Sequence, residues 1–396
     1  MLNAQTGGGR LVVGRFQPVG AGTQVEVRSL RDGARLWSRT LDVDQHLTFL
    51  TDDVMALQTD GRSGSADALT VLDAATGAQL WQRGQIAYFG QAGGRILAED
   101  VAGAAGETGA VEVRPAGEDP ANPEPEQRGR RYLALDEWTG ATVWEVRVPV
   151  GSIADFRLTG GGHTGPAYMS QLSPAGVLQI RDLGTGRVVA EHRLDFSGAI
   201  SSFRTGDPAV TEQVLIAKAG ARGTDVYDRG TGRLLWHWQA ERPSPWGADL
   251  FACAPGLYCL GDDSGLTALD ARTGARRWHA DGYNQVLGGD GAVLLVRPGR
   301  PGGDAAAPVV ALDARTGRAA RELAGWHFAG TVPGRGLVLW KSTGDRAAVL
   351  GLADPLGGRV TVFGRSASWD GRPECQWDRG MLACLADGVL AVWRLP

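Results

Sequence analysis

An eleven-residue motif returns along the whole chain, and this repeat constrains the possible folds more than any other feature of the sequence. Residues 71–81 read Val-Leu-Asp-Ala-Ala-Thr-Gly-Ala-Gln-Leu-Trp, and residues 268–278 read Ala-Leu-Asp-Ala-Arg-Thr-Gly-Ala-Arg-Arg-Trp. Anchored on its glycine, the motif occurs eight times at intervals of 41 to 63 residues, which predicts a repeat architecture. The glycines are Gly33, Gly77, Gly140, Gly186, Gly232, Gly274, Gly317 and Gly358.

Two other positions of the motif are nearly constant. An aspartate precedes the glycine by four residues in seven copies, and Ser29 takes its place in the first. Aspartate accepts backbone N–H bonds in turns, and glycine adopts the positive φ that such turns commonly need. A tryptophan follows the glycine by four residues in five copies. On the next strand this large ring would cover a wide apolar area, so we interpret it as structural. These tryptophans are Trp37, Trp81, Trp144, Trp236 and Trp278.

The length of the repeat predicts four strands per copy. The segment before each aspartate is alternating or continuously apolar, which is typical of a strand. Two further short strands fit between successive motifs. Four strands in 41 to 46 residues is the size of a β-propeller blade. In one copy we predict strands at residues 249–254, 257–260, 265–270 and 275–279.

The Leu-Asp-x-x-Thr-Gly-x-x-x-Trp pattern resembles the tryptophan-docking repeat of quinoprotein-like β-propellers, and it does so from about Arg10 to Pro396. The resemblance implies an all-β, eight-bladed propeller of four-stranded antiparallel blades, in which each repeat tryptophan packs between neighbouring blades. The family contains alcohol and sugar dehydrogenases as well as non-catalytic scaffolds. Fold does not determine function, so the resemblance leaves the activity open.

The ends of the chain predict how the ring closes. Seven full blades fit between Leu47 and about Gly364, and candidate strands remain at both ends. We expect the last blade to combine N- and C-terminal strands, because such a blade hides the free sheet edges. Six candidates compete for four places, so the choice among them stays open. No linker interrupts the repeat, so residues 1–396 form a single predicted domain. The terminal candidates are residues 10–16, 24–29, 35–39, 374–377, 381–385 and 389–395.

One repeat interval contains an insertion at residues 101–130. The interval from Asp73 to Asp136 is 63 residues, longer than any other, and the extra segment is acidic and rich in proline. This composition predicts a loop rather than a further domain. It falls between the second and third strands of a blade, on the face that also carries the blade-to-blade connections. Propeller ligands usually bind that face, although a solvated insertion without function is an equally simple interpretation.

The four cysteines fall into two local pairs, Cys253 with Cys259 and Cys375 with Cys384. Each pair spans a turn between apolar segments, and opposing positions of a hairpin lie close enough for a disulfide. Two disulfides favour a location outside the cytoplasm. Buried free thiols in a cytoplasmic protein remain the alternative. Neither pair has the CxxC spacing of a metal site.

The chemistry of a quinone-dependent enzyme is not visible in the sequence. Members of the family that use the quinone carry two adjacent cysteines over the cofactor and a cluster of calcium ligands, and no two cysteines are adjacent here. The six histidines show no metal-binding spacing, and no nucleophile elbow or phosphate loop occurs. We therefore predict no catalytic residues, no metal and no cofactor.

Charge and hydropathy limit the possible partners. The net charge of −4 gives no electrostatic reason to bind nucleic acid. No apolar run approaches the ~18 residues of a membrane-spanning helix. We favour a monomer with a protein or glycan partner.

Aromatic residues in the predicted blade-to-blade connections are the candidate binding residues. They could form a partial ring round the mouth of the channel, where they would stack on sugars or hold a peptide. The alternative is that they pack between blades as ordinary core. The candidates are Trp246, Tyr283, Trp326 and Trp369.

The function predicted from the sequence is a non-catalytic binding or assembly platform outside the cytoplasm, which presents loops of one propeller face to a protein or glycan. Two alternatives remain open: a ligand-sensing or carbohydrate-binding ectodomain of a membrane-anchored protein, and a degenerate quinone-dependent oxidoreductase.

Overall fold

The structure is a computed structural model of the whole chain. It describes residues 2–16, 22–42, 44–59, 67–101, 129–157, 167–196, 200–205, 213–218, 224–239, 250–262, 264–289, 292–298, 309–323, 325–332, 335–344, 347–353, 359–366, 369, 373–387 and 389–395.

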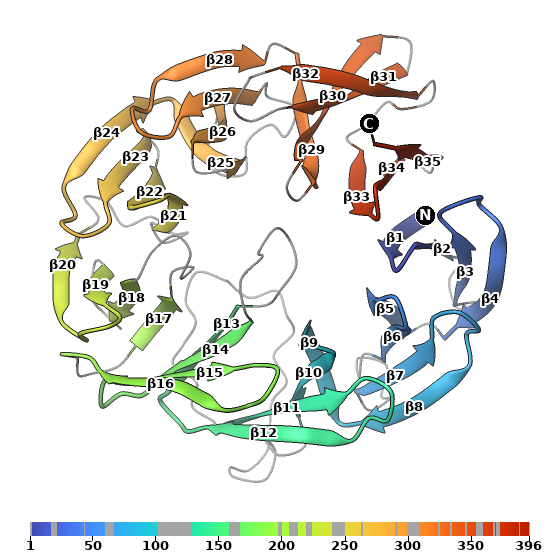
Figure 1. Cartoon of the computed structure of the whole chain (residues 1–396), viewed down its shortest axis with the longest axis horizontal. Coiled ribbons are helices and arrows are strands. Elements are labelled where there is room, and N and C mark those ends of the chain that lie inside the picture. Colours follow the sequence, from blue (N-terminus) through green and yellow to red (C-terminus); the bar gives the residue numbers. More distant parts are fainter. Residues whose placement is uncertain are drawn as a thin grey trace.

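All regular secondary structure among these residues is β-strand, and no helix occurs among them. The strands make eight four-stranded antiparallel sheets and one three-stranded sheet, arranged as blades round a common axis (Figure 1). The predicted all-β propeller with eight four-stranded antiparallel blades is therefore confirmed, and the three-stranded sheet lies beside them. In chain order the strands are β1 Leu2–Gly7, β2 Arg10–Phe16, β3 Thr23–Ser29, β4 Arg35–Leu41, β5 Gln45–Leu50, β6 Val54–Thr59, β7 Ala68–Asp73, β8 Gln79–Gly84, β9 Ile86–Ala92, β10 Arg95–Asp100, β11 Arg130–Asp136, β12 Thr142–Val148, β13 Ile153–Arg157, β14 Tyr168–Leu172, β15 Val177–Asp182, β16 Val188–Arg193, β17 Ile200–Thr205, β18 Gln213–Lys218, β19 Thr224–Asp228, β20 Leu234–Trp238, β21 Phe251–Ala254, β22 Leu257–Asp262, β23 Gly265–Asp270, β24 Arg276–Asp281, β25 Tyr283–Gly289, β26 Val293–Pro298, β27 Val309–Asp313, β28 Ala319–Leu323, β29 His327–Val332, β30 Gly336–Gly344, β31 Ala347–Ala353, β32 Val360–Ser366, β33 Glu374–Asp378, β34 Met381–Ala386 and β35 Val389–Arg394.

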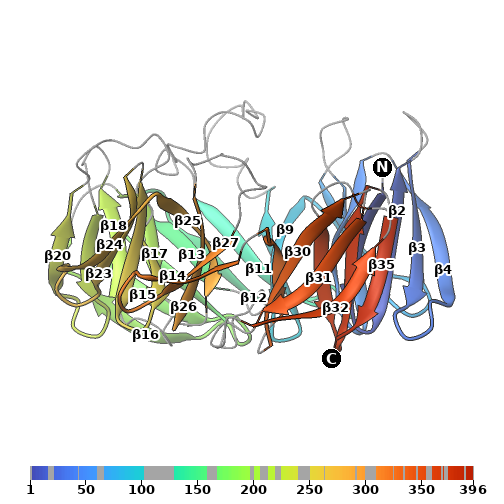
Figure 2. The same ribbon diagram turned by 90° about the horizontal axis from the view of Figure 1, so that it is seen from above.

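Each blade is a meander whose first strand lies nearest the axis and whose last strand lies at the rim (Figure 1). Antiparallel order places the turns between strands one and two, and between three and four, on one face of the ring. We call this the turn face. The connections between strands two and three and from blade to blade lie on the opposite face, which we call the connection face. Figure 2 shows the strands crossing between the two faces, with the chain ends marked at opposite faces.

Burial follows the position of a strand in its blade. All residues of β7 except Asp73 are buried, because neighbouring blades cover both faces of a third strand. The fourth strand β8 has only exposed and half-buried residues, as expected at the rim. The core therefore consists of apolar layers between successive blades rather than one central cluster.

The repeat turn has the predicted geometry. Oδ1 of Asp313 accepts hydrogen bonds from the backbone N–H of Arg315 at 3.0 Å and of Thr316 at 2.8 Å, and from the Thr316 hydroxyl at 2.9 Å. Gly317 follows with a φ of 67°. The aspartates of five other described copies bond to the threonine three residues later in the same way. These aspartates are turn caps, as the pattern predicts.

Each repeat tryptophan docks onto the next blade. The indole N–H of Trp278 donates to the backbone carbonyl of Ala314 at 3.0 Å, and a Cβ added to Gly317 would come within 2.4 Å of the ring. The other four rings make the same two contacts with the following repeat turn, with N–H···O distances of 2.9 to 3.0 Å. In the copy with Ala190 in place of tryptophan, the carbonyl of Arg193 lies against Gly232 instead.

A β-bulge precedes the tryptophan position in the fourth strands β4, β8, β12, β16, β20, β24 and β28. In β24, for example, Trp278 pairs with Ala268 and Arg276 pairs with Leu269, so Arg277 is the extra residue. A bulge increases the local twist and redirects the following side chain. It therefore turns the ring toward the neighbouring blade, and the motif carries no separate signal for it.

The predicted mode of ring closure is wrong. The N-terminal strands form a complete sheet of their own, β1–β4, and the C-terminal strands form the three-stranded sheet β33–β35. No blade mixes strands from both ends among the described residues. The cause is β1, Leu2–Gly7, which is absent from the predicted strands because only Leu2 and Ala4 in it are apolar. With β1 present, the N-terminal set needs no strand from the other end.

The two terminal sheets meet side by side at what we call the seam. Oδ2 of Asp378 accepts the backbone N–H of Gly9 at 2.6 Å, and Oε1 of Gln376 accepts that of Thr6 at 2.8 Å. Arg379 forms an ion pair with Asp52 in the turn between β5 and β6, the next blade beyond β1–β4. An apolar cluster of Leu11, Val13, Leu30 and Ala383, with Ala4, Met381 and Leu390 beside it, fills the interior of the seam.

Candidate functional site

The insertion at residues 101–130 joins β10 to β11, the second and third strands of one blade, as its position in the repeat predicts. Residues 102–128 lie outside the described part of the chain. At its start, the N–H of Val101 donates to the carbonyl of Gln85 at 3.0 Å, and the N–H of Gln85 donates to the carbonyl of Asp67 at 2.6 Å. Gln85 is the residue that connects β8 to β9 of the next blade. Asp67 is the last residue of the connection from β6 to β7 in the preceding blade. These bonds join all three segments on the connection face.

Ion pairs hold the two strands that carry the insertion. Arg131 bonds to Oδ2 of Asp100 at 2.8 Å and also pairs with Glu145 on β12. Arg130 lies 3.5 Å from Oε2 of Glu99. Burial raises the pKa of Glu99, and the positive charge of Arg130 partly opposes this shift. The base of the insertion is therefore held by charges from three adjacent strands.

Two predicted binding aromatics lie in the core or at its border. Trp369, in the connection from β32 to β33, is 1% exposed and packs edge to face against Trp393, with ring centroids 5.4 Å apart. Trp326, before β29, is half-buried, and its ring lies where a Cβ on Gly351 would come within 2.9 Å. Both rings are inserted between blades in this structure, and Trp369 presents no open ring face.

The other two predicted aromatics differ in position. Tyr283 begins β25 on the connection face, is half-buried, and packs at the border of the cluster that contains Cys259 and Trp278. It keeps part of its surface available on that face. Trp246 lies outside the described residues.

Further aromatic rings of the first strands pack between blades. Phe89 on β9 and Phe156 on β13 have centroids 4.6 Å apart, and both contact Tyr132 on β11. Tyr88 stacks on Phe49 at 4.8 Å, and burial raises the pKa of Tyr88 to about 12. These aromatic side chains pack the innermost strands together rather than form an open binding site.

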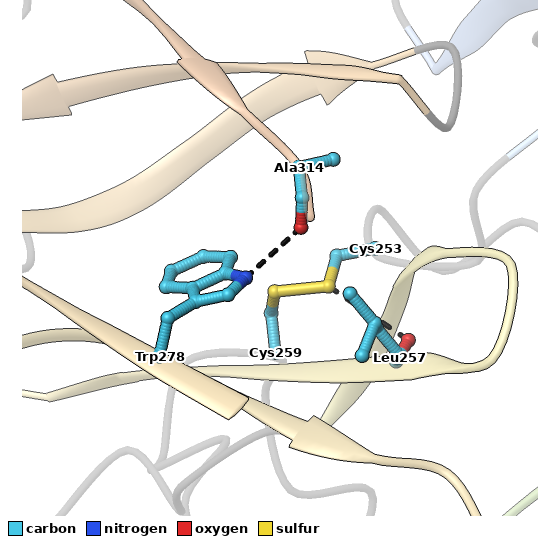
Figure 3. The surroundings of a disulfide bond; sticks show 5 residues. All are labelled: Cys253, Leu257, Cys259, Trp278 and Ala314. Atoms are coloured by element: carbon cyan, nitrogen blue, oxygen red, sulfur yellow. Dashed lines mark hydrogen bonds between the residues drawn. A yellow bond between two sulfur atoms is a disulfide. The ribbon is translucent and has the colours of Figure 1, made fainter. Parts of the chain in front are cut away.

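Both predicted disulfides are present, and the chain has no free cysteine. Cys375 and Cys384 are directly opposite in the β33–β34 hairpin. Cys253 is the extra residue of a bulge in β21 and joins Cys259 on β22. Figure 3 shows this second bridge beside Trp278, whose indole bonds to Ala314 of the next blade. The bridge therefore belongs to the same apolar cluster between blades as a docked repeat tryptophan.

The sequence analysis did not predict one polar cluster. Asp225 on β19 lies directly opposite His237 on β20, with Nδ1 2.6 Å from Oδ1, and the hydroxyl of Tyr227 donates to Oδ2 at 3.3 Å. The spacing of the histidines gave no reason to single out His237. The available signal was Asp225 itself, a charged residue three positions before the repeat aspartate, where only the first copy, with Glu26, also carries a charge.

The described residues contain no group of three or more histidine, cysteine, aspartate or glutamate side chains that could hold a metal ion. The disulfides commit all four cysteines to hairpins, so the adjacent pair that covers the quinone in related enzymes has no counterpart here. The donor set does not fit that cofactor. Within the ranges described, no helix is long and apolar enough to cross a membrane.

Several solved structures resemble this chain at low sequence identity. A eukaryotic initiation factor structure is 10% identical, with 92% of this chain and 88% of that chain covered and a TM-score of 0.51. BamB from Moraxella catarrhalis is 15% identical, with all of both chains covered and a TM-score of 0.38. A quinohemoprotein alcohol dehydrogenase from Comamonas testosteroni is 14% identical, with 87% and 69% covered and a TM-score of 0.42. No protein of curated function matches the sequence.

A family model described as outer membrane protein assembly factor BamB matches residues 127–325, half of the chain. The matched range holds five of the eight repeat glycines, from Gly140 to Gly317, and three of the five docked tryptophans. The repeat, the docking geometry and this match agree: the chain belongs to the family of PQQ-type β-propellers that the model describes.

Proposed function

We propose that this protein is a non-catalytic platform that binds a protein partner through its connection face. The observation that carries the proposal is the base of the insertion. The Glu99–Arg130 and Asp100–Arg131 ion pairs hold the two strands from which it leaves, and Val101 bonds to the neighbouring blade-to-blade connection. A rigid scaffold that positions a variable loop is a common way to present a binding surface. The family model, described as an assembly factor, supports the same role.

The proposal places the partner on the same face as the partly exposed ring of Tyr283. Trp246 stays a proposed contact residue, and Trp326 contributes by supporting the connection before β29. Trp369 would act only by fixing its own connection, because its ring is buried. Aromatic side chains at such positions supply much of the binding energy of protein interfaces.

Affinity capture from the native source tests this role. Full-length protein should capture a partner that a variant without residues 105–127 does not capture. The two proteins should have the same melting transition. A Tyr283→Ala variant should weaken capture without unfolding the blade. Equal capture by the intact and shortened proteins would refute a role for the insertion, and selective elution by free glycans would replace the protein partner with a carbohydrate.

We further propose that the protein works outside the cytoplasm as a monomer. The two hairpin disulfides support this location, because such bridges persist in oxidising compartments. Non-reducing mass spectrometry of protein from its native source should recover Cys253 joined to Cys259 and Cys375 joined to Cys384. Free thiols in that material would contradict the proposed compartment.

The absence of catalysis can be tested directly. Absorbance titration with the quinone in the presence of calcium should show no saturable spectral change, because the four cysteines are held in hairpins and cannot cover the cofactor. Saturable binding that supports alcohol oxidation would establish an enzyme and overturn the platform role.

A further inference from the structure

The terminal sheet β33–β35 has an open position at its rim. Every other blade places a fourth strand outside its third strand, whereas β35 is the last described strand of its sheet (Figure 1). All of the described strands already belong to a sheet, so none of them is available for this position. The rim edge of β35 therefore offers unpaired backbone groups to an added strand.

Equivalent hydrogen bonds align β35 with the complete blades. In the blade β21–β24, the residue after Asp270 donates its N–H to the carbonyl of Gly256, and in the terminal sheet Leu395 donates to Gly380 in the same way. Leu395 therefore corresponds to the residue after the repeat aspartate, and Arg394 to the aspartate. Counting back two residues, Val392 corresponds to Ala268, which lies opposite the docked Trp278.

The exposure of Val392 shows that no fourth strand of the described residues covers it. Its side chain is 36% exposed, whereas the equivalent residues Val27, Val71, Ala134, Val226 and Ala268 are each 0% exposed. Val389, at the start of β35, is 37% exposed. In the complete blades a fourth strand covers these positions.

The neighbouring blade has a matching gap. Gly33, the repeat glycine of β1–β4, has a φ of 73°, and a Cβ built on it would meet no atom within 4 Å. At Gly77 and Gly140 the same position lies under the tryptophan of the preceding blade, at 2.8 and 2.7 Å. The blade preceding Gly33 in the ring is β33–β35, where no strand of the described residues takes the fourth position and supplies such a tryptophan ring.

These two observations describe one vacant position at the seam, bounded by the rim edge of β35 and by the turn at Gly33. We propose that it is a docking site for an extended segment of another polypeptide, which adds antiparallel to β35 and places a tryptophan or similar ring over Gly33. Main-chain bonds to an open edge supply affinity in such strand addition, and the aromatic socket supplies specificity. The site is separate from the connection face and does not depend on the role proposed there.

The charged residues around the vacant position indicate which side chains the docked segment carries. Arg31, Arg35 and Arg394 are exposed around the vacancy, with Asp32 as the acidic residue of the same turn. Oδ1 of Asp32 already accepts the N–H of Ala34 at 3.1 Å. The surroundings therefore carry a positive excess, which favours acidic residues beside the aromatic ring.

A labelled peptide tests the site on the full chain. The probe has the sequence of residues 140–148, Gly-Ala-Thr-Val-Trp-Glu-Val-Arg-Val, with glutamate in place of the arginine, and it carries a fluorescein at its amino end. Fluorescence anisotropy should show saturable binding, and replacing the peptide tryptophan with alanine should weaken it by about tenfold or more. Hydrogen exchange should slow in β35 when the peptide is bound.

Two protein variants locate the binding. Val392→Glu should weaken the peptide by at least about tenfold, because it places a charge where the ring and strand pack. Val362→Glu is the matched control, since Val362 is 49% exposed on the complete blade β29–β32 and should leave binding unchanged. Equal binding of the two peptides, insensitivity to Val392→Glu, or protection in strands other than β35 would overturn the proposal. Dimers that form without peptide and disappear in Val392→Glu would assign the site to a second copy and also overturn it.

Discussion

The repeat glycine serves two physical purposes at once. At Gly317 the backbone has a φ of 67°, which favours glycine, and the ring of Trp278 lies where a side chain would begin. The sequence indicates the first purpose, because an aspartate four residues earlier marks a tight turn. The second depends on a residue of the preceding blade, and becomes visible only when neighbouring blades are placed side by side.

Comparing two glycines separates these effects. Gly317→Ala should destabilise the protein by about 1–3 kcal/mol more than Gly33→Ala, because both variants pay for a positive φ but only the first displaces a ring. Chemical denaturation of both variants measures the difference. Equal free energies of unfolding would mean that the tryptophan is not docked on the repeat turn.

The turn-capping aspartates predict an acid dependence of stability. A hydrogen bond from Arg277 lowers the pKa of Asp270 to about 2, against the opposing effect of burial, and Thr273 adds to the lowering. A folded-state pKa below the unfolded value of ~3.9 means that the carboxylate stabilises the fold above pH ~4 and loses this effect as the pH falls toward 2. Asp270→Asn keeps an oxygen acceptor but does not titrate. Its urea midpoint should therefore fall less steeply than that of the wild type between pH 4 and 2, and parallel curves would contradict the assignment.

At the scale of elements, the sequence predicted strands well where apolar residues alternate. The predicted strand at residues 10–16 coincides with β2, and residues 265–270 coincide with β23. It failed at β1, whose polar residues pair with β2 through backbone bonds that no side-chain pattern reveals. That single omission led to the wrong closing blade.

The candidate binding residues were harder to predict than the strands. An aromatic residue in a connection has the same sequence signature whether its ring faces solvent or turns back between blades. Trp369 is 1% exposed because residues of the sheets β33–β35 and β29–β32 enclose it. The motif spacing does not predict which residues of these sheets contact a ring in the connection between them. Tyr283 kept a partly open position because it begins β25 on the connection face.

The insertion is expected to contribute little to folding. Deleting residues 105–127 leaves the Glu99–Arg130 and Asp100–Arg131 pairs in place, so the β10–β11 hairpin keeps its own stabilising contacts. The melting temperature should change by less than about 2 °C, because loop length affects stability only weakly. A large drop, measured by circular dichroism, would mean that the insertion packs against the ring.

At the scale of the whole molecule, the ring depends on contacts between blades rather than on shared strands. Five tryptophans link successive blades, and the seam between β33–β35 and β1–β4 has side-chain bonds and an apolar cluster instead. The blades thus form one ring of repeated units, as the spacing of the motif predicts.

The seam is the expected weak point of this ring. Asp378→Ala removes the acceptor for the Gly9 N–H and should cost about 1–3 kcal/mol, because it leaves a partly buried donor unpaired. Hydrogen exchange should accelerate in β1 and β33 before it does in β13 or β17. Uniform acceleration round the ring would show that the seam is no weaker than the other contacts.

The central functional claim is that a protein partner binds the connection face, and site-specific photocrosslinking in the native source tests it most directly. Val150, 57% exposed in the connection after β12, and Trp138, 45% exposed in the repeat turn before it, are large apolar residues on opposite faces of the same part of the ring. A photoreactive amino acid at Val150 should give a specific partner adduct that the same group at Trp138 does not give. Adducts from Trp138 alone, or equally from both positions, would contradict the claim.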